Sequence, residues 1–331
     1  MKRIISYFAI ALIGIAIVSC NNKGKKQKSG QGNLTKVTVA QFGQEKYLMY
    51  LPFYVAQEKE FFKGEGLEIS VKYSGNDDQV FATVLKGEAM FGIGDPIFTA
   101  VAREKGAKGK VVASIVSGVS IWGLTNKNIL EIEKAEDFSN FKIGSFPAPS
   151  TVFTLIKSTT SSPSVKNVEI IQAPIGAQIA LLEKGLVNVA LEIEPNVSIA
   201  ESQGYKVIYS ASKFFGEFAF TGVTTTEDNI AKKKETVQKF VNAIEKSLAY
   251  IQTSPEGAIE IAQVLFPSME KEVVAKAVMR MIEDKAIPAH AVTSDEGWQY
   301  AMKIRKEIGD LKEIKPTTDA VDNSFAEKAM Q

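Results

Sequence analysis

The segments that follow the predicted strands, together with two predicted connections between sheets, carry acidic and aromatic side chains. In an open α/β sheet, ligands bind beyond the carboxyl ends of the strands. This rule selects the following candidate ligand-binding residues: Gln44, Tyr47, Tyr50, Asn76, Asp95, Trp122, Ser150, Thr151, Glu192, Glu194 and Phe220. A carboxylate accepts hydrogen bonds from an amino group or a protonated ring nitrogen, and an aromatic side chain stacks on a planar ring. The pattern therefore favours a planar amino-heterocycle as the ligand.

Several candidates also have a purely structural interpretation. Three of them are adequate N-caps of predicted helices: Asn76, Asp95 and Ser150. A cap can serve both roles, because free backbone N–H groups beside it still point toward the ligand. Tyr47 and Tyr50 can instead be packing residues, and Trp122 can belong to the core. Of Glu192 and Glu194, we expect one to face the ligand and the other to serve the N-terminus of the next helix.

Basic side chains are absent from most of these segments. Arginine and histidine occur only at Arg3, Arg103, Arg280, Arg305 and His290, none of which falls in a predicted strand-end loop. Bidentate recognition of an anion by a guanidinium group is therefore not expected. Anion binding stays open as an alternative, because helix N-termini can hold an anion and Lys46 lies close to the first loop.

The composition argues against several other function classes. The formal net charge of +1 gives no clustered basic footprint for nucleic acid. The chain has one cysteine and one histidine, so a Cys/His pair in the folded body, a metal site and a disulfide are not expected. It also lacks the H-E-x-x-H, C-x-x-C, G-x-S-x-G and ATP-binding loop signatures. We expect a protein that is not an enzyme and has no cofactor.

The elements that must position these residues alternate between strand and helix. The first run of predicted strands covers 37–42, 67–73, 90–93 and 110–116, and the second covers 141–145, 168–171, 187–191 and 206–209. Helices lie between them, and helical patterns follow at 230–253, 256–265, 270–284 and 294–308. This order predicts an α/β protein with mostly parallel sheets. Because one core stops growing at roughly 250–300 residues, two lobes are expected.

The N-terminal segment differs from the body. Lys2 and Arg3 precede an almost wholly apolar run of about 15 residues, which is shorter than the roughly 20 needed to span a membrane. This is typical of a secretory signal, here residues 1–19. The run ends at Cys20 in a pattern that resembles the lipobox of bacterial lipoproteins, which implies acylation of this cysteine, for example with palmitate. An uncleaved anchor or an ordinary buried cysteine is the alternative. Residues 20–33 then form a polar tether.

Three stretches resemble one protein family. They are Leu51–Lys59 with 61–68, Lys86–Ala89 with 91–94, and 102–107. The family comprises the substrate-binding proteins of ABC importers for nitrate, alkylsulfonates, taurine and thiamine-type pyrimidine precursors. The resemblance spans about residues 36–300.

The resemblance implies a two-lobed periplasmic-binding-protein clamshell of type II that closes by a hinge motion on its ligand. The first lobe would cover 34–125 plus 219–331, with the C-terminal helices on it, and the second 126–218. The two crossover strands would lie near 123–127 and 218–224. The protein would be a monomer that is lipid-anchored to the membrane, facing the periplasm or the cell exterior.

The resemblance leaves the partner and the solute open. The first expectation is delivery of a pyrimidine-type or other amino-heterocyclic precursor to an ABC permease and its ATPase. One alternative is a nitrate, alkylsulfonate or taurine binding protein. A second is a biosynthetic enzyme of the thiamine-pyrimidine type on the same fold, and a third is a sensory protein that signals to a receptor.

Overall fold

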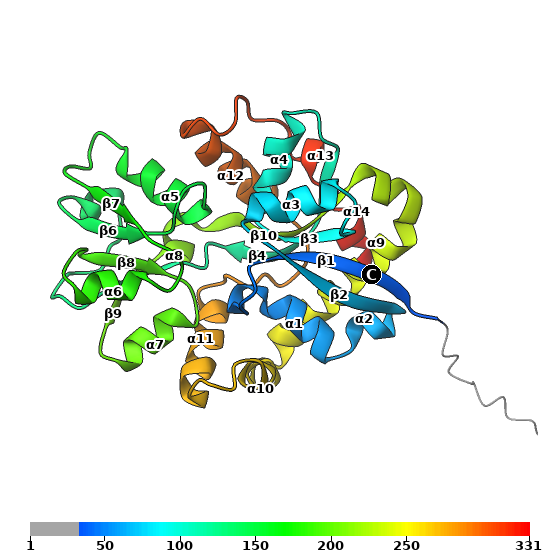
Figure 1. Ribbon diagram of the computed structural model, residues 1–331, viewed down its shortest axis with the longest axis horizontal. Coiled ribbons are helices and arrows are strands. Elements are labelled where there is room, and N and C mark those ends of the chain that lie inside the picture. Colours follow the sequence, from blue (N-terminus) through cyan, green and yellow to red (C-terminus); the bar gives the residue numbers. More distant parts are fainter. Residues whose placement is uncertain (1–32) are drawn as a thin grey trace, which may run out of the picture. The chain divides into compact units, whose positions relative to one another are not determined.

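Two mixed five-stranded sheets organise the chain in the computed structural model, which describes residues 33–331 (Figure 1). The first sheet has the order β2-β1-β3-β10-β4, with the strands β1 (Thr35–Phe42), β2 (Leu67–Ser74), β3 (Phe91–Gly94), β4 (Gly109–Gly118) and β10 (Glu217–Thr226). The second has the order β7-β6-β8-β5-β9, with the strands β5 (Trp122–Thr125), β6 (Lys142–Ser145), β7 (Glu169–Gln172), β8 (Val189–Glu192) and β9 (Lys206–Ser210). Each sheet with the elements packed on it is called a lobe below. This is the periplasmic-binding-protein fold expected from the sequence.

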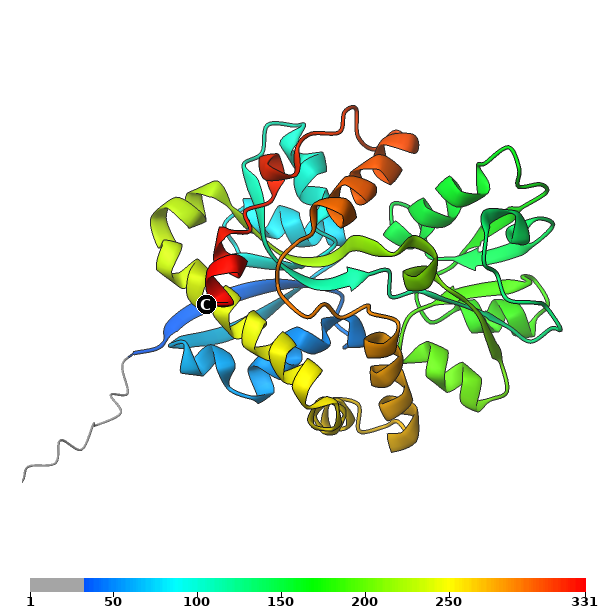
Figure 2. The ribbon, with the colours of Figure 1, turned by 180° about the vertical axis from the view of Figure 1, so that it is seen from behind.

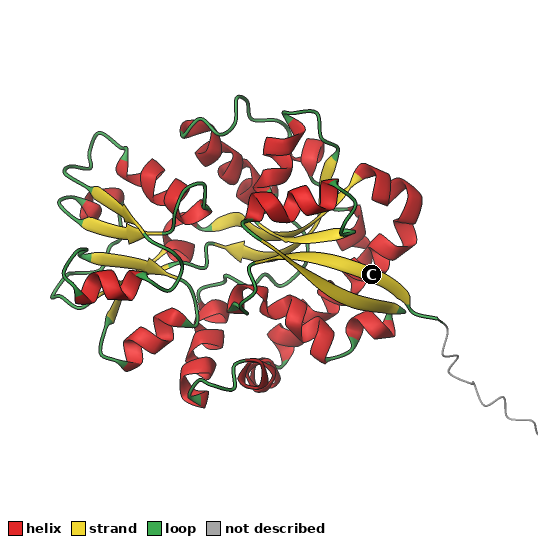
Figure 3. Cartoon of the chain, in the orientation of Figure 1, coloured by secondary structure: helices red, strands yellow, loops and turns green. Residues whose placement is uncertain are grey.

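Helices cover the sheets on both faces, as the colouring by secondary structure shows (Figure 3). The first lobe contains α1 (Leu51–Glu58), α2 (Phe61–Gly64), α3 (Asp77–Leu85) and α4 (Ile97–Arg103). The second contains α5 (Thr151–Thr160), α6 (Gln178–Glu183), α7 (Asn196–Ser202) and α8 (Ala211–Phe215). Short 3-10 helices occur at Leu48–Tyr50 and Ala135–Phe138.

Successive residues of β3 show how the first sheet is sandwiched. Neighbouring side chains on a strand point to opposite faces. Phe91 stacks on Phe240 of α9 (Glu227–Thr253), with ring centroids 4.1 Å apart. At Gly92, an added Cβ would lie 3.1 Å from side-chain atoms of Val80 and Val84 in α3. The nearest atom is Oγ1 of Thr224 in β10, at 2.7 Å, so α3 and the neighbouring strand together leave this face of β3 little room for a side chain, and β3 is buried along its whole length.

The connections between the sheets differ from the expectation. Residues 123–127 and 218–224 were expected to be crossovers, but they fall largely in β5 and β10. Each of these strands lies inside a sheet and runs antiparallel to both of its neighbours. The chain instead passes between the sheets at 119–121 and at 211–216. Residues 123–127 and 218–224 are not mainly connections, because β5 and β10 are buried and pair with a neighbouring strand along both edges. The limits of the two lobes as moving bodies stay a prediction.

The C-terminal segment consists of helices that join the first lobe. It contains α9, α10 (Pro255–Leu265), α11 (Lys271–Glu283), α12 (Asp295–Glu307), α13 (Thr317–Ala320) and α14 (Ser324–Ala329). Helices α9 and α14 pack on the first sheet, as expected. Helices α11 and α12 also reach the second lobe, where they contact α7 and α5 respectively (Figure 2).

The described helices give no membrane span, because none in residues 33–331 is both long and apolar enough. The predicted signal peptide, Cys20 and most of the predicted tether lie outside the described residues. Their assignment therefore stays a prediction.

Candidate functional site

A cavity of about 400 Å³ lies between the two lobes. Its walls come from the segments that follow β1, β2 and β3 in the first lobe and β6, β7 and β8 in the second. These are the carboxyl ends of the parallel strands of each sheet, where α/β proteins bind their ligands. The lining is more apolar than polar, with the polar groups concentrated in the first lobe.

Aromatic rings form part of the first-lobe wall. The ring centroid of Tyr47 lies 5.8 Å from that of Phe42 and 6.4 Å from that of Tyr50. Burial raises the pKa of Tyr47 to about 12, with nearby Glu45 contributing, and holds the pKa of Tyr50 well above its ordinary value. Both hydroxyl groups therefore keep their protons at neutral pH and can donate hydrogen bonds. Tyr47 and Tyr50 are themselves largely buried, and the partly exposed rings of Phe42 and Phe98 add to the surface that a planar ligand can contact.

Carboxyl groups form the acidic part of the same wall, and two of them, Asp77 and Asp95, accept hydrogen bonds from the backbone of the site. Asp77 begins α3, and its Oδ1 accepts a hydrogen bond from the backbone N–H of Asp95 at 3.0 Å. Burial raises the pKa of Asp77 to about 7, and the negative charge of Asp95 adds to this shift. Near neutral pH, Asp77 can therefore either accept or donate a hydrogen bond. Asp95 accepts from the backbone N–H of Ile97 at 3.0 Å, so it supports the start of α4 and lines the cavity as well.

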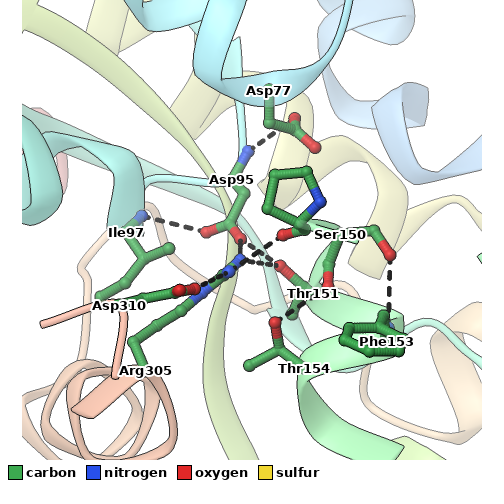
Figure 4. Close-up of polar contacts among 10 residues, drawn as sticks. Asp77, Asp95, Ile97, Ser150, Thr151, Phe153, Thr154, Arg305 and Asp310 are labelled. Carbon is green, nitrogen blue, oxygen red and sulfur yellow. Dashed lines mark hydrogen bonds and ion pairs between the residues drawn. The ribbon is translucent and has the colours of Figure 1, made fainter. Parts of the chain in front are cut away.

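The second-lobe wall is mostly apolar. Its lining consists of Phe146, Pro147, Ala148, Pro149, Ser150, Thr151, Val152, Pro174, Ile175 and Ile193. Ser150 is the N-cap of α5, and its hydroxyl accepts a hydrogen bond from the backbone N–H of Phe153 at 3.2 Å. The hydroxyl group of Thr151 donates to Asp95 across the two lobes (Figure 4). This wall can cover one face of a flat ligand.

Arg305 lies directly behind the wall and was not predicted. It comes from α12, and its side chain is only 2 % exposed. Its Nη2 donates to Asp95 at 3.1 Å and to Thr151 at 3.0 Å (Figure 4). The sequence held no local signal for this contact, because α12 follows the last strand by many residues and returns to the site only through tertiary packing. The rule that ligands bind beyond the carboxyl ends of strands cannot identify a residue on such a distant helix.

The structure brings most of the predicted ligand residues together. The cavity wall includes Tyr47, Tyr50, Asn76, Asp95, Ser150, Thr151 and Phe220. It also includes side chains that were not selected, among them Phe42, Glu45, Asp77, Asp78 and Phe98. Asp77 and Asp78 stand in a strand-end loop, so the rule that found Asn76 could have found them.

Gln44 and Trp122 do not lie on the cavity wall. Gln44 is exposed, and its neighbour Glu45 takes the position on the wall. Trp122 is fully buried in β5, and its Nε1 donates to Asp284 at 2.7 Å. Trp122 is therefore a core residue, and its indole N–H links the second sheet to Asp284 at the end of α11.

The two glutamates after β8 are also structural. Glu192 accepts hydrogen bonds from the backbone N–H groups of Gly176 at 2.8 Å and Ile193 at 3.1 Å. It thereby holds the loop that carries the lining residues Pro174 and Ile175. Burial raises the pKa of Glu192, although these hydrogen bonds oppose the shift.

Glu194 accepts hydrogen bonds from the backbone and side chain of Ser198 at 3.0 and 2.9 Å. It also pairs with Arg280 at 2.7 Å. Sequence spacing suggested that one of Glu192 and Glu194 would serve the following helix. Glu194 does so for α7, and Glu192 supports the neighbouring loop instead of facing the cavity.

The geometry suits capture of a planar molecule with a polar edge. One wall supplies aromatic rings, the opposite wall supplies apolar contacts, and Asp77, Asn76 and Asp95 supply hydrogen-bonding groups. No basic side chain is among the cavity-lining residues that the structure describes. Within residues 33–331, no group of three or more metal-ligating side chains converges.

Two curated proteins match most of the chain. YtlA of Bacillus subtilis (strain 168), named as a binding protein, is 22% identical over 304 residues, which are 89% of this chain and 90% of YtlA. The riboflavin-binding protein RibY of Chloroflexus aurantiacus is 23% identical over 278 residues, which are 82% of this chain and 78% of RibY.

Solved structures share the fold at lower identity. The ligand-binding component of an ABC-type import system from Staphylococcus aureus, solved with zinc, has a TM-score of 0.70 at 12% identity and covers 89% of this chain and 99% of its own. The alkanesulfonate-binding protein SsuA of Xanthomonas axonopodis pv. citri has a TM-score of 0.67 at 12% identity and covers 88% and 100%. The profile of the NMT1/THI5-like family matches residues 49–258, well over half of the chain. The chain therefore belongs to the NMT1/THI5-like family.

Proposed function

We propose that this protein is the solute-binding component of an ABC importer and that it captures an amino-heterocyclic solute of the pyrimidine type. The cavity carries this proposal, because its aromatic and acidic first-lobe wall faces an apolar second-lobe wall. The acidic groups complement amino groups and protonated ring nitrogens. The resemblance to binding proteins, one of them from an import system, supports delivery of the solute to a permease.

The direct test is the small molecule that co-purifies with the protein. Native mass spectrometry of the gently purified protein should give a mass above that of the chain, and release by denaturation should yield an amino-heterocycle. Purified protein should also gain melting temperature with pyrimidine precursors, because a ligand that binds only the folded state stabilises it. A large gain with alkylsulfonates and none with pyrimidines would refute the assignment of the solute.

Riboflavin is the second candidate, and the size of the cavity favours it. Pockets of roughly 300–1,000 Å³ enclose drug-sized ligands, and about 400 Å³ exceeds what one small ring fills. A flavin also offers the flat surface and polar edge that the walls complement. The curated relative RibY is named for riboflavin binding. Quenching of flavin fluorescence on addition of the protein would favour this candidate over a single-ring pyrimidine.

Anionic solutes fit the cavity less well. Structural neighbours are named for alkanesulfonate binding, yet the described lining of this cavity has carboxylates and no lysine or arginine. A sulfonate there would meet the like charges of Glu45 and Asp78, and the guanidinium group of Arg305 lies behind the wall, already paired with Asp95 and Asp310. The NMT1/THI5-like family includes enzymes, but both curated relatives are named as binding proteins, and the described lining holds no histidine, cysteine or lysine. We infer a binding protein.

Export and lipidation through Cys20 complete the proposal. An acylated cysteine would keep a monomeric binding protein at the membrane, near its permease. Metabolic labelling with an alkyne fatty acid tests this directly. The parent chain should take up the label and sediment with membranes, and the Cys20→Ser variant should do neither. A Cys20→Ser variant that still carries the label would refute lipidation at this residue.

A further inference from the structure

The two walls of the cavity are joined by a cluster of polar contacts around Arg305 (Figure 4). Asp95 belongs to the first lobe and Thr151 to the second, and both line the cavity. The Thr151 hydroxyl donates to the Asp95 carboxylate. The guanidinium group of Arg305 donates to both of these residues, yet Arg305 is not part of the cavity lining. It therefore connects the two walls from behind.

Arg305 contacts both lobes, but its partners in the two lobes differ in charge. On the first-lobe side, it pairs with Asp95 at 3.1 Å and with Asp310 at 2.9 Å. Its guanidinium carbon also lies 5.0 Å from the ring centroid of Phe98. On the second-lobe side, it donates to the carbonyl oxygen of Pro149 at 2.9 Å and to the hydroxyl of Thr151 at 3.0 Å. Charged partners lie in one lobe, and neutral partners lie in the other.

This division makes the contact reversible. A buried charge is costly when it loses its charged partner. If the lobes separate, Arg305 keeps both carboxylates and gives up only two neutral acceptors. Opening then costs only the loss of a few hydrogen bonds, and a ligand bound between the walls adds its own binding free energy to the closed arrangement.

Arg280 shows the opposite arrangement. It lies on α11, and both of its carboxylate partners, Glu194 and Glu201, belong to the second lobe. Glu194 is fully buried, so separation from Arg280 would leave an uncompensated charge. Asp284, which follows α11, likewise accepts from Trp122 at 2.7 Å and Ser210 at 2.8 Å in the second sheet. Helix α11 is thus bound to the second lobe, while α12 carries a contact that can open.

We propose that Arg305 is a positioning residue that couples ligand capture to lobe closure, by holding Asp95 and Thr151 of the cavity wall together in the closed arrangement. This inference rests on the solute-binding function proposed above. Without Arg305, every group of the described cavity wall remains, but the closed arrangement loses the hydrogen bonds from Arg305 to Thr151 and Pro149 of the second lobe. Arg305→Met should therefore shift the molecule toward an open arrangement and weaken capture of the solute.

The test measures the separation of the lobes directly and needs no knowledge of the solute. Cys20 is the only cysteine, so a Cys20→Ser background allows spin labels at Lys86→Cys in the first lobe and Lys184→Cys in the second, both exposed. Double electron–electron resonance on the full chain then gives the distribution of distances between the labels. We expect Arg305→Met to lower the ratio of closed to open molecules about tenfold, and Arg305→Lys to restore part of it.

Arg103→Met is the matched control. Arg103 also pairs with two carboxylates, Glu227 and Asp319, but both belong to the first lobe. This variant should leave the distance distribution of the parent unchanged. A folded Arg305→Met protein with the parent distribution would overturn the proposal.

Thr151→Val decides the question if Arg305→Met does not fold. It removes only the hydroxyl group that Asp95 and Arg305 contact, so a smaller shift toward longer distances is expected. The parent distribution in that variant would equally contradict the proposal. Failure of solute binding in the parent would refute the function while leaving the distance result intact, so the two failures are distinguishable.

Discussion

Asp77 lines the cavity and also affects the stability of the fold, because burial changes the pKa of its carboxyl group. Its pKa is about 7 in the folded protein, against an ordinary value near 4. Between these values the folded state holds more protons than the unfolded state. The free energy of unfolding therefore falls as the pH rises from about 4 to about 7, and the full cost of the buried charge is present above that window.

Asp77→Asn should remove this cost. Asparagine keeps an oxygen that can accept from the backbone N–H of Asp95 but cannot ionise. We expect the variant to be more stable than the parent by about 2 kcal/mol at pH 8 and to show little difference at pH 4. Urea denaturation at the two pH values measures this.

Asp78→Asn is the control for this prediction, because Asp78 is the next residue of α3 and is exposed. The charge of Asp78 adds only a minor part of the shift at Asp77, so the gain for Asp78→Asn at pH 8 should be well below that for Asp77→Asn. A gain for Asp77→Asn that does not depend on pH would contradict the assigned cause.

The position of a residue on the cavity wall was predictable where the backbone alone fixes it. Tyr50, Asn76 and Ser150 follow strands, and the carboxyl ends of parallel strands meet at one edge of a sheet, so the sequence placed them at the cavity. Arg305 could not be placed in this way, because its contact with Asp95 spans 210 residues of sequence. Glu194 serves the start of α7, as expected for one of the two glutamates, but its pairing with Arg280 on a distant helix could not be predicted.

Most helices and strands could be predicted from the sequence. The way in which the strands join into sheets could be predicted less well. The strand at 67–73 agrees with β2 to within a residue. The helical segment between the strands predicted at 37–42 and 67–73 is divided into α1 and α2 at Glu60, which has a φ of 55°. Local propensity gives no warning of such a break at a glutamate. The insertion of β5 and β10 inside their sheets depends on pairing between distant strands, which periodicity does not contain.

The pairing of α11 with α7 gives a prediction at this scale. Arg280→Met removes the compensating charge of buried Glu194 and should lower the free energy of unfolding by about 3 kcal/mol. Lys276→Met is the control, because Lys276 also pairs with Glu201 but its side chain is 56% exposed. It should cost less than about 1 kcal/mol. Equal losses in the two variants, measured by chemical denaturation, would show that Glu194 does not need Arg280.

The whole described body should unfold as one unit. One continuous hydrophobic cluster includes side chains from both sheets, among them Val39 and Phe91 in the first and Leu124 and Ile143 in the second. Helices α11 and α12 add polar contacts between the lobes. We therefore expect a single transition in differential scanning calorimetry, with equal calorimetric and van't Hoff enthalpies.

The double variant Arg280→Met with Arg305→Met tests the source of this cooperativity. It removes the described arginine contacts of both helices with the second lobe, so its transition should broaden or divide into two. Two transitions already present in the parent protein would contradict the expectation of one cooperative unit.

The place of β10 within the first sheet has a consequence for how the molecule is made. This strand lies between β3 and β4, yet the ribosome produces it only after the whole second sheet. Until residue 226 has emerged, β3 and β4 have no strand to join them, and Arg305 arrives about 80 residues later still. A nascent chain therefore has no finished cavity. During synthesis, the growing polypeptide stays unable to hold a solute until nearly all of the folded body has been made.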